Sequence, residues 1–111
     1  MYCQGNKPNK MNFDEYQKFA LDTDLVHPLN YYFLGLAEEA GEVCGLRKRF
    51  LRDEGNIDYA KLNKECGDVL WYLALICEKY GISLQDVAIT NLQKLTDRQE
   101  RGVITGTGSE R

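Results

Sequence analysis

The sequence has few of the side chains on which nucleophilic and zinc enzymes depend. Its 111 residues include one histidine, His27, and two serines, Ser83 and Ser109, which disfavours serine–histidine catalysis. The four cysteines show no Cys-x-x-Cys spacing and no neighbouring histidines, which argues against a tetrahedral zinc site. We expect three of them to act as small apolar residues inside helices of a protein kept in a reducing compartment: Cys44, Cys66 and Cys77.

Several other features are missing. No apolar run approaches the ~20 residues that span a bilayer, and the polar segment 1–12 lacks the apolar stretch of a signal peptide, so a cytoplasmic location is expected. The net charge of −3 favours neither a nucleic acid nor an anionic membrane as partner. Gly-rich phosphate-binding loops of the Gly-x-x-x-x-Gly-Lys-Ser/Thr and Gly-x-Gly-x-x-Gly types are absent.

Helical periodicity dominates the chain, and no strand alternation competes with it. Apolar spacing and capping residues predict helices over about 12–21, 29–51, 58–80 and 83–102. The predicted fold is all-α, a four-helix bundle with two long antiparallel helices flanked by two shorter ones. We expect an N-terminal extension at 1–11, one domain at 12–102 and a flexible tail at 103–111. Long amphipathic helices in so short a chain also predict a homo-oligomer, at least a dimer.

Four carboxylates stand inside the apolar stripes of the two long predicted helices. Glu39 and Glu42 are three residues apart on one helix, and Glu65 and Asp68 are three apart on the next, so each pair projects from one helix face. Two like charges 4 Å apart repel by roughly 4 kcal/mol at an effective dielectric of about 20. No lysine or arginine lies near them in either stripe. A hard cation such as Mg²⁺, which prefers oxygen ligands, would supply the missing charge.

The alternative is that these acids are solvated surface residues. The chain has 17 acids, so one acidic pair at this spacing carries little information. The pattern favours a metal site because it occurs on two consecutive helices, both times within the apolar stripe. An oxygen-only cluster without Glu-x-x-His pairs suits Mg²⁺ acting on phosphates better than a di-iron site.

Other residues are candidates for binding a substrate. Tyr72 shares the face of Glu65 and Asp68. Three polar residues border the apolar stripe of the last helix and could hold phosphate oxygens or pair with surface acids: Asn91, Lys94 and Arg98. Gln17, in the apolar stripe of the first helix, could contact a base edge or satisfy a buried hydrogen bond.

The segment from Gly35 to Val43, Gly-Leu-Ala-Glu-Glu-Ala-Gly-Glu-Val, followed by Glu-Cys-Gly-Asp-Val-Leu-Trp-Tyr-Leu from Glu65, resembles the MazG-like all-α nucleotide pyrophosphohydrolases. The motif of that family is E-x-x-E on one helix and E-x-x-D on the next. The likeness extends to Phe13-x-x-Tyr16-Gln17 and to Asn91-Leu-x-Lys94-Leu-x-x-Arg98, and so covers about residues 12–102.

The resemblance implies Mg²⁺-dependent hydrolysis of a nucleoside triphosphate, often a deoxynucleotide, to the monophosphate and pyrophosphate. It also implies that Glu39, Glu42, Glu65 and Asp68 hold the metal, that the protein is a dimer or tetramer, and that the site lies in a helical cleft. One acid must accept a proton from the attacking water, either Glu39 or Glu42. The alternative function is a non-catalytic helical module that binds a nucleotide or a protein and is stabilised by a metal.

Overall fold

The computed structural model describes residues 9–53 and 55–102, which form four helices and contain no strand. Helix α1 spans Phe13–Asp22, α2 spans Leu29–Asp53, α3 spans Tyr59–Lys79 and α4 spans Leu84–Glu100. The ends differ from those predicted by at most two residues. The predicted tail at 103–111 and the predicted extension before residue 9 lie outside the described residues.

Side-chain caps begin three of the helices. The Asn12 side chain accepts a hydrogen bond from the Glu15 amide at 2.8 Å, and the Glu15 carboxylate accepts one from the Asn12 amide at 3.1 Å. This reciprocal pair is a capping box. The side chains of Asp58 and Ser83 cap α3 and α4 by accepting hydrogen bonds from the amides of residues 61 and 86. Local chemistry thus sets where these helices start.

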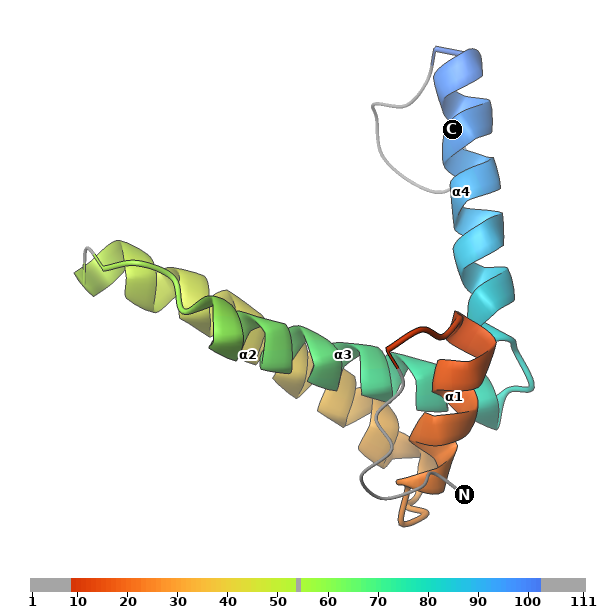
Figure 1. The fold of residues 1–111 in the computed structure, drawn as a ribbon, viewed down its shortest axis with the longest axis horizontal. Helices are drawn as coiled ribbons and strands as arrows, with labels where there is room; N and C mark the ends of the chain where they lie inside the picture. Colours follow the sequence, from red (N-terminus) through yellow and green to blue (C-terminus); the bar gives the residue numbers. More distant parts are fainter. Residues whose placement is uncertain (1–8, 54, 103–111) are drawn as a thin grey trace.

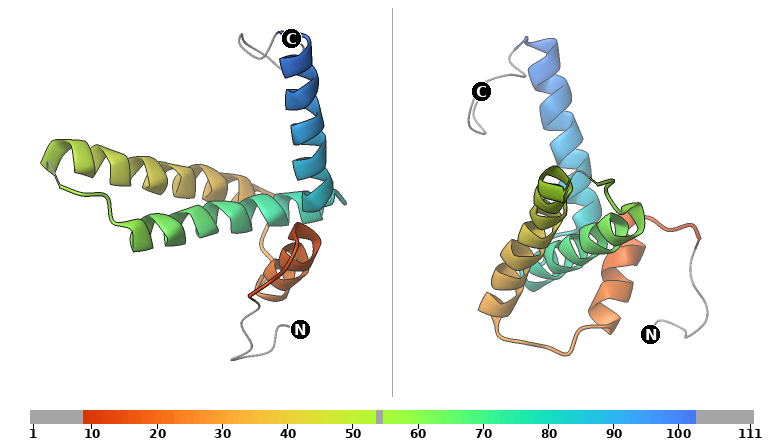
Figure 2. Two further views of the ribbon diagram at one scale, coloured as in Figure 1. Left: turned by 45° about the horizontal axis from the view of Figure 1, so that its top comes forward. Right: turned by 90° about the vertical axis from the view of Figure 1, so that its left-hand side faces the viewer.

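Helices α2 and α3 form a long antiparallel hairpin, and α1 packs across one end of it (Figure 1). Helix α4 touches α1 at its start and then projects away from the hairpin, as the views from other directions also show (Figure 2). The all-α class with two long antiparallel helices and two shorter ones is confirmed. The four helices of this chain nevertheless do not close into a compact bundle, because most of α4 packs against none of the other three helices.

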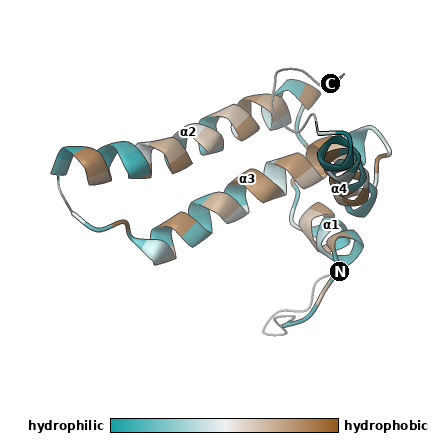
Figure 3. Ribbon diagram, turned by 90° about the horizontal axis from the view of Figure 1, so that it is seen from above, coloured by the Kyte–Doolittle hydropathy of each residue, from teal (hydrophilic) through white to brown (hydrophobic). Residues whose placement is uncertain are grey.

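The hydrophobic core lies where α1, the first half of α2, the second half of α3 and the start of α4 meet. Its buried members include Ala20, Tyr32, Leu75 and Leu84. Apolar and polar residues alternate along α2 and α3 (Figure 3), but among the described residues at the far end of the hairpin only Leu46 is buried. The two long helices are therefore packed into the core at one end. The second half of α2 and the first half of α3 extend away from the core, and we call this part of the hairpin the arm.

The predicted burial of the helical cysteines is wrong in two cases out of three. Cys77 lies in the core, and its burial raises the pKa of its thiol. Cys44, in the second half of α2, and Cys66, in the first half of α3, are exposed. None of the helices formed by the described residues is long and apolar enough to cross a membrane.

A hydrogen-bonded network anchors the connection between α1 and α2 to the core. The buried hydroxyl of Tyr32 donates to the Asp24 carboxylate at 2.7 Å and accepts from the His27 amide at 2.9 Å. Lys79, at the end of α3, lies 3.5 Å from the same carboxylate and 4.7 Å from the centre of the Tyr32 ring. The side chain of Asp24 is 1% exposed. The network satisfies a buried charge and joins the connection to both long helices.

Candidate active site

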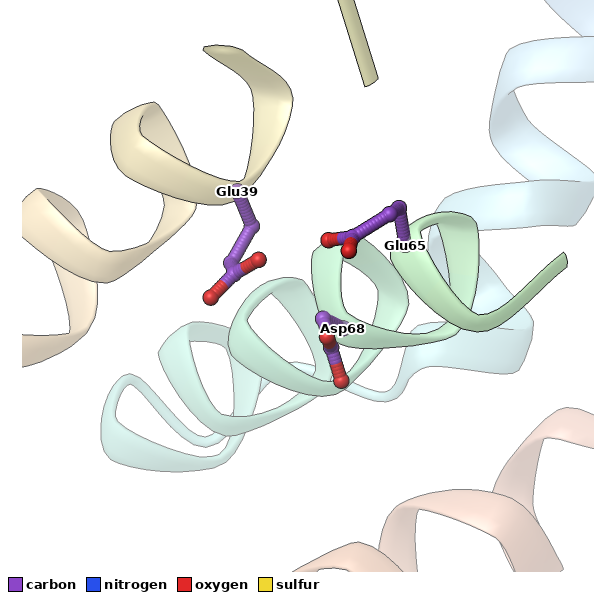
Figure 4. Close-up of side chains that lie close together, drawn as sticks. All are labelled: Glu39, Glu65 and Asp68. Carbon is purple, nitrogen blue, oxygen red and sulfur yellow. The ribbon is translucent and has the colours of Figure 1, made fainter. Parts of the chain in front are cut away.

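Three of the four predicted acids come together between α2 and α3. One carboxylate oxygen from each of Glu39, Glu65 and Asp68 lies within 4.8 Å of the others. Glu39 reaches across from α2, Glu65 faces it from α3, and Asp68 lies one turn further along α3 (Figure 4). The group lies at the base of the arm, where the apolar core ends. Glu39 and Glu65 are half-buried and Asp68 is exposed, so the group is open to a ligand from solvent.

The electrostatics of this group favour a cation. Burial, followed by the nearby charges of Asp68 and Glu65, raises the pKa of Glu39 above its ordinary value. Within residues 9–53 and 55–102, no lysine or arginine forms an ion pair with any of the three acids. Oxygen ligands without sulfur or nitrogen match the preference of Mg²⁺, Ca²⁺ or Mn²⁺. The donor set therefore fits a hard divalent cation.

Glu42, the fourth predicted acid, does not join the group. It is exposed on α2, one turn from Glu39, and its carboxylate is not among the three that converge. The three-residue spacing placed Glu39 and Glu42 on one face of the helix, but only Glu39 reaches α3. The two acids of this pair thus occupy different positions relative to Glu65 and Asp68.

Tyrosines from three helices surround the acids. The pKa of Tyr16, on α1, is raised by burial and by the nearby carboxylate of Asp68. Tyr72 lies one turn after Asp68 on α3, on the face predicted for it, and its hydroxyl is 3.5 Å from that of Tyr31. The hydrogen bond with Tyr31, burial and the charge of Glu39 raise the pKa of Tyr72 to about 12. At physiological pH the hydroxyls of Tyr16 and Tyr72 are protonated and can donate hydrogen bonds.

Gly35 explains how Tyr72 reaches this position. The Tyr72 ring lies directly against the Gly35 backbone, and a β-carbon at residue 35 would overlap the ring. The sequence contains the glycine, but its partner, 37 residues later, becomes visible only in the tertiary structure. The close approach fixes the Tyr72 side chain beside the acids.

The Gln17 side chain forms hydrogen bonds with backbone groups at the start of α4. Its amide nitrogen donates to the Ile82 carbonyl at 2.9 Å, and its oxygen accepts from the Leu84 amide at 2.8 Å. The side chain is buried, 6% exposed, and ties α1 to the turn before α4. This geometry matches the structural alternative, a satisfied buried hydrogen bond. Contact between Gln17 and a base stays an untested prediction.

The polar residues of α4 lie apart from the acids in this chain. Asn91 and Lys94 line a pocket of about 370 Å³ that contains none of the three acids. Arg98 is buried, 3% exposed, further along α4. The sequence pattern could not reveal this separation, because it depends on the direction in which α4 leaves the core.

Sequence reasoning did not assign a role to three residues beside the site: Tyr16, Tyr31 and Glu38. A helical wheel of α2 places Tyr31 and Glu38 on one flank, seven residues apart. The seven-residue spacing is therefore visible in the sequence, but by itself it indicates a site less strongly than the neighbouring acidic pair Glu39 and Glu42 does. Tyr16 comes from a separate helix, and its nearness to Asp68 needed the fold.

Comparison with known proteins shows which family the chain belongs to. Residues 29–103 match the model of the MazG nucleotide pyrophosphohydrolase domain, which covers all of α2, α3 and α4. The chain is 37% identical over 114 aligned residues to the gene 37 protein of Mycobacterium phage L5, covering 91% of this chain and 100% of that relative. No solved structure matches the chain significantly. The chain therefore belongs to the family of the MazG nucleotide pyrophosphohydrolase domain.

Proposed function

We propose that the protein hydrolyses a nucleoside triphosphate, of the ribo or deoxy series, to the monophosphate and pyrophosphate in the presence of Mg²⁺. The observation that carries this proposal is the convergence of three carboxylates, with no ion-pair partner among the described residues, in a chain of this family. When bound there, Mg²⁺ would neutralise triphosphate charge, polarise the α-phosphoryl group and lower the pKa of a coordinated water.

The residues of the chain would divide the remaining work. Glu39, Glu65 and Asp68 would hold the cation. Glu42, exposed and one turn away from Glu39, would accept the proton of the attacking water through its carboxylate. Tyr72, held by Gly35, would donate a hydrogen bond from its hydroxyl to the substrate beside the acids. The open face of the site admits both water and nucleotide.

A second copy of the chain is part of the proposal, as a homodimer or homotetramer. The radius of gyration is 16.8 Å, against about 13 Å for a compact domain of this size. Many large apolar side chains are exposed, among them Leu34, Leu51 and Leu92. Asn91, Lys94 and Arg98 would contact phosphate oxygens only in an assembly that brings α4 over the acids of another copy.

The activity is tested with a panel of ribo- and deoxynucleoside triphosphates, incubated with Mg²⁺ and assayed separately for pyrophosphate and orthophosphate. We expect pyrophosphate with an equimolar amount of monophosphate from at least one of them, because attack at the α-phosphorus releases these products. Omission of Mg²⁺ is the control. Orthophosphate alone, or no product from any nucleotide, would contradict the proposal.

The separate positions of Glu39 and Glu42 predict separate defects. Glu39→Gln removes a ligand of the cation, so the apparent Kd for Mg²⁺ should rise by roughly ten- to a hundredfold or more. Glu42→Gln should leave that Kd within about threefold of the unmodified protein and lower kcat by roughly 10²–10⁴-fold, as the loss of a general base does. Calorimetric titration with Mg²⁺ and steady-state kinetics measure the two effects. Equal weakening of Mg²⁺ binding by both variants would show that Glu42 is also a ligand.

A further inference from the structure

A small aromatic pocket opens beside the acids, and the chemistry proposed so far uses only the side of it formed by Tyr72 and Gly35. Its volume is about 240 Å³. Four lining residues follow one flank of α2 at helical spacing, and the fifth comes from α3: Tyr31, Leu34, Gly35, Glu38 and Tyr72. The pocket thus combines two aromatic rings, an exposed leucine and one carboxylate.

Tyr31 offers a flat surface that is already held in place. The His27 ring stacks on it with centroids 3.9 Å apart and an interplanar angle of 21°. The Tyr72 ring lies 5.9 Å away, and the two tyrosine hydroxyls are 3.5 Å apart. Tyr31 is still 40% exposed. A planar ligand could therefore stack on Tyr31 without first having to order its side chain.

The pocket is next to the candidate cation site. Glu38 precedes Glu39 in α2, and Tyr72 follows Asp68 by one helical turn, about 6 Å along the helix axis. The charges of both Glu38 and Glu39 reach the Tyr72 hydroxyl. A nucleotide whose phosphates approach the acids would thus have its base within reach of the pocket.

We propose that this pocket binds the base of the nucleotide against Tyr31, and that Glu38 selects a base that carries an exocyclic amino group. The inference rests on the proposed function. A carboxylate only accepts hydrogen bonds, and the amino groups of cytosine, adenine and guanine donate them. Uracil and thymine present carbonyl oxygens on both sides of their single N–H, and these oxygens repel the carboxylate. Glu38 therefore determines specificity, and Tyr31 supplies affinity.

The sharpest test compares dCTP with dUTP. Cytosine carries an amino group at position 4 beside a ring nitrogen that accepts hydrogen bonds, whereas uracil carries a carbonyl there beside a ring N–H. We expect kcat/KM of the unmodified protein to favour dCTP by roughly ten- to a hundredfold, the usual discrimination of a base-reading hydrogen bond. Glu38→Gln, whose amide both donates and accepts, should bring the ratio close to one. Tyr31→Ala should raise KM for both nucleotides by about ten- to a hundredfold, because the stacking ring is lost. Tyr31→Phe retains the ring and should keep the KM of the unmodified protein. Tyr59→Ala, at a tyrosine that is 79% exposed on the arm, is the control.

Two kinds of failure are distinguishable. If pyrophosphate is released but the unmodified protein prefers dUTP, or Glu38→Gln leaves the dCTP/dUTP ratio unchanged, the base pocket is overturned and the hydrolase is not. If no triphosphate yields pyrophosphate, the proposed hydrolase activity is refuted. Calorimetric titration with dCMP and dUMP then tests whether the pocket binds a base. Tighter binding of dCMP that Glu38→Gln abolishes supports it, and equal or undetectable binding of the two overturns it.

Discussion

Asp68→Asn is expected to lower nucleotide hydrolysis by about a thousandfold while the chain keeps its fold. Loss of a proposed cation ligand would remove several kcal/mol of charge stabilisation in the transition state, and each 1.4 kcal/mol or so is a factor of ten in rate. In the absence of metal, the variant should be more stable than the unmodified protein by about 1 kcal/mol, because a like charge has been removed from beside Glu39 and the group is partly solvated.

Kinetics and thermal unfolding, each with and without Mg²⁺, measure these effects. Mg²⁺ should raise the Tm of the unmodified protein, since the ion binds the folded state alone, and the rise should shrink in Asp68→Asn. Asp53→Asn is a matched control at the tip of the arm, where the side chain is 57% exposed. Hydrolysis by Asp68→Asn at the rate of this control would refute the assignment of the site.

Tyr32→Phe is expected to lower the free energy of unfolding by about 1–3 kcal/mol. The substitution leaves the ring in the core but removes the hydroxyl that donates to Asp24 and accepts from the His27 amide. Asp24 would keep its charge in a place where only 1% of its side chain meets solvent. Tyr59→Phe changes the same group on an exposed tyrosine and is the control. Equal stability of the two variants in urea would contradict the role assigned to the network.

The same network predicts how the stability difference depends on pH. Burial raises the pKa of Asp24, but the hydrogen bonds from Tyr32 and the Val26 amide and the charge of Lys79 outweigh burial and bring it below its ordinary value of 3.8. A lowered pKa in the folded state gives stability that is fully present above the unfolded value and is lost as the pH falls through the folded value. The difference between Tyr32→Phe and the unmodified protein should therefore be constant near neutral pH and shrink below about pH 4. Urea unfolding at pH 7 and pH 3 measures it.

The helices and their starting points follow from the sequence by itself, because caps and apolar periodicity are local. Each cap lies three residues before the amide from which it accepts a hydrogen bond, so the local sequence is enough to predict it; the caps are Asn12, Asp58 and Ser83. The acidic spacing on α2 and α3 is local in the same sense. These patterns also carried the resemblance to the family to which the chain belongs.

The tertiary structure decided which acids meet and which partners they have. Helical spacing puts Glu39 and Glu42 on one face, but the way in which α3 packs against α2 brings only Glu39 into the group with Glu65 and Asp68. The same packing places Tyr72 on Gly35 and leaves Cys44 exposed, although its position inside a predicted helix had suggested a core residue. Residues of one helix are related by a fixed geometry, so their relative positions follow from their spacing. Contacts between helices depend on how the side chains of both surfaces fit together, and no local segment of the sequence determines that fit.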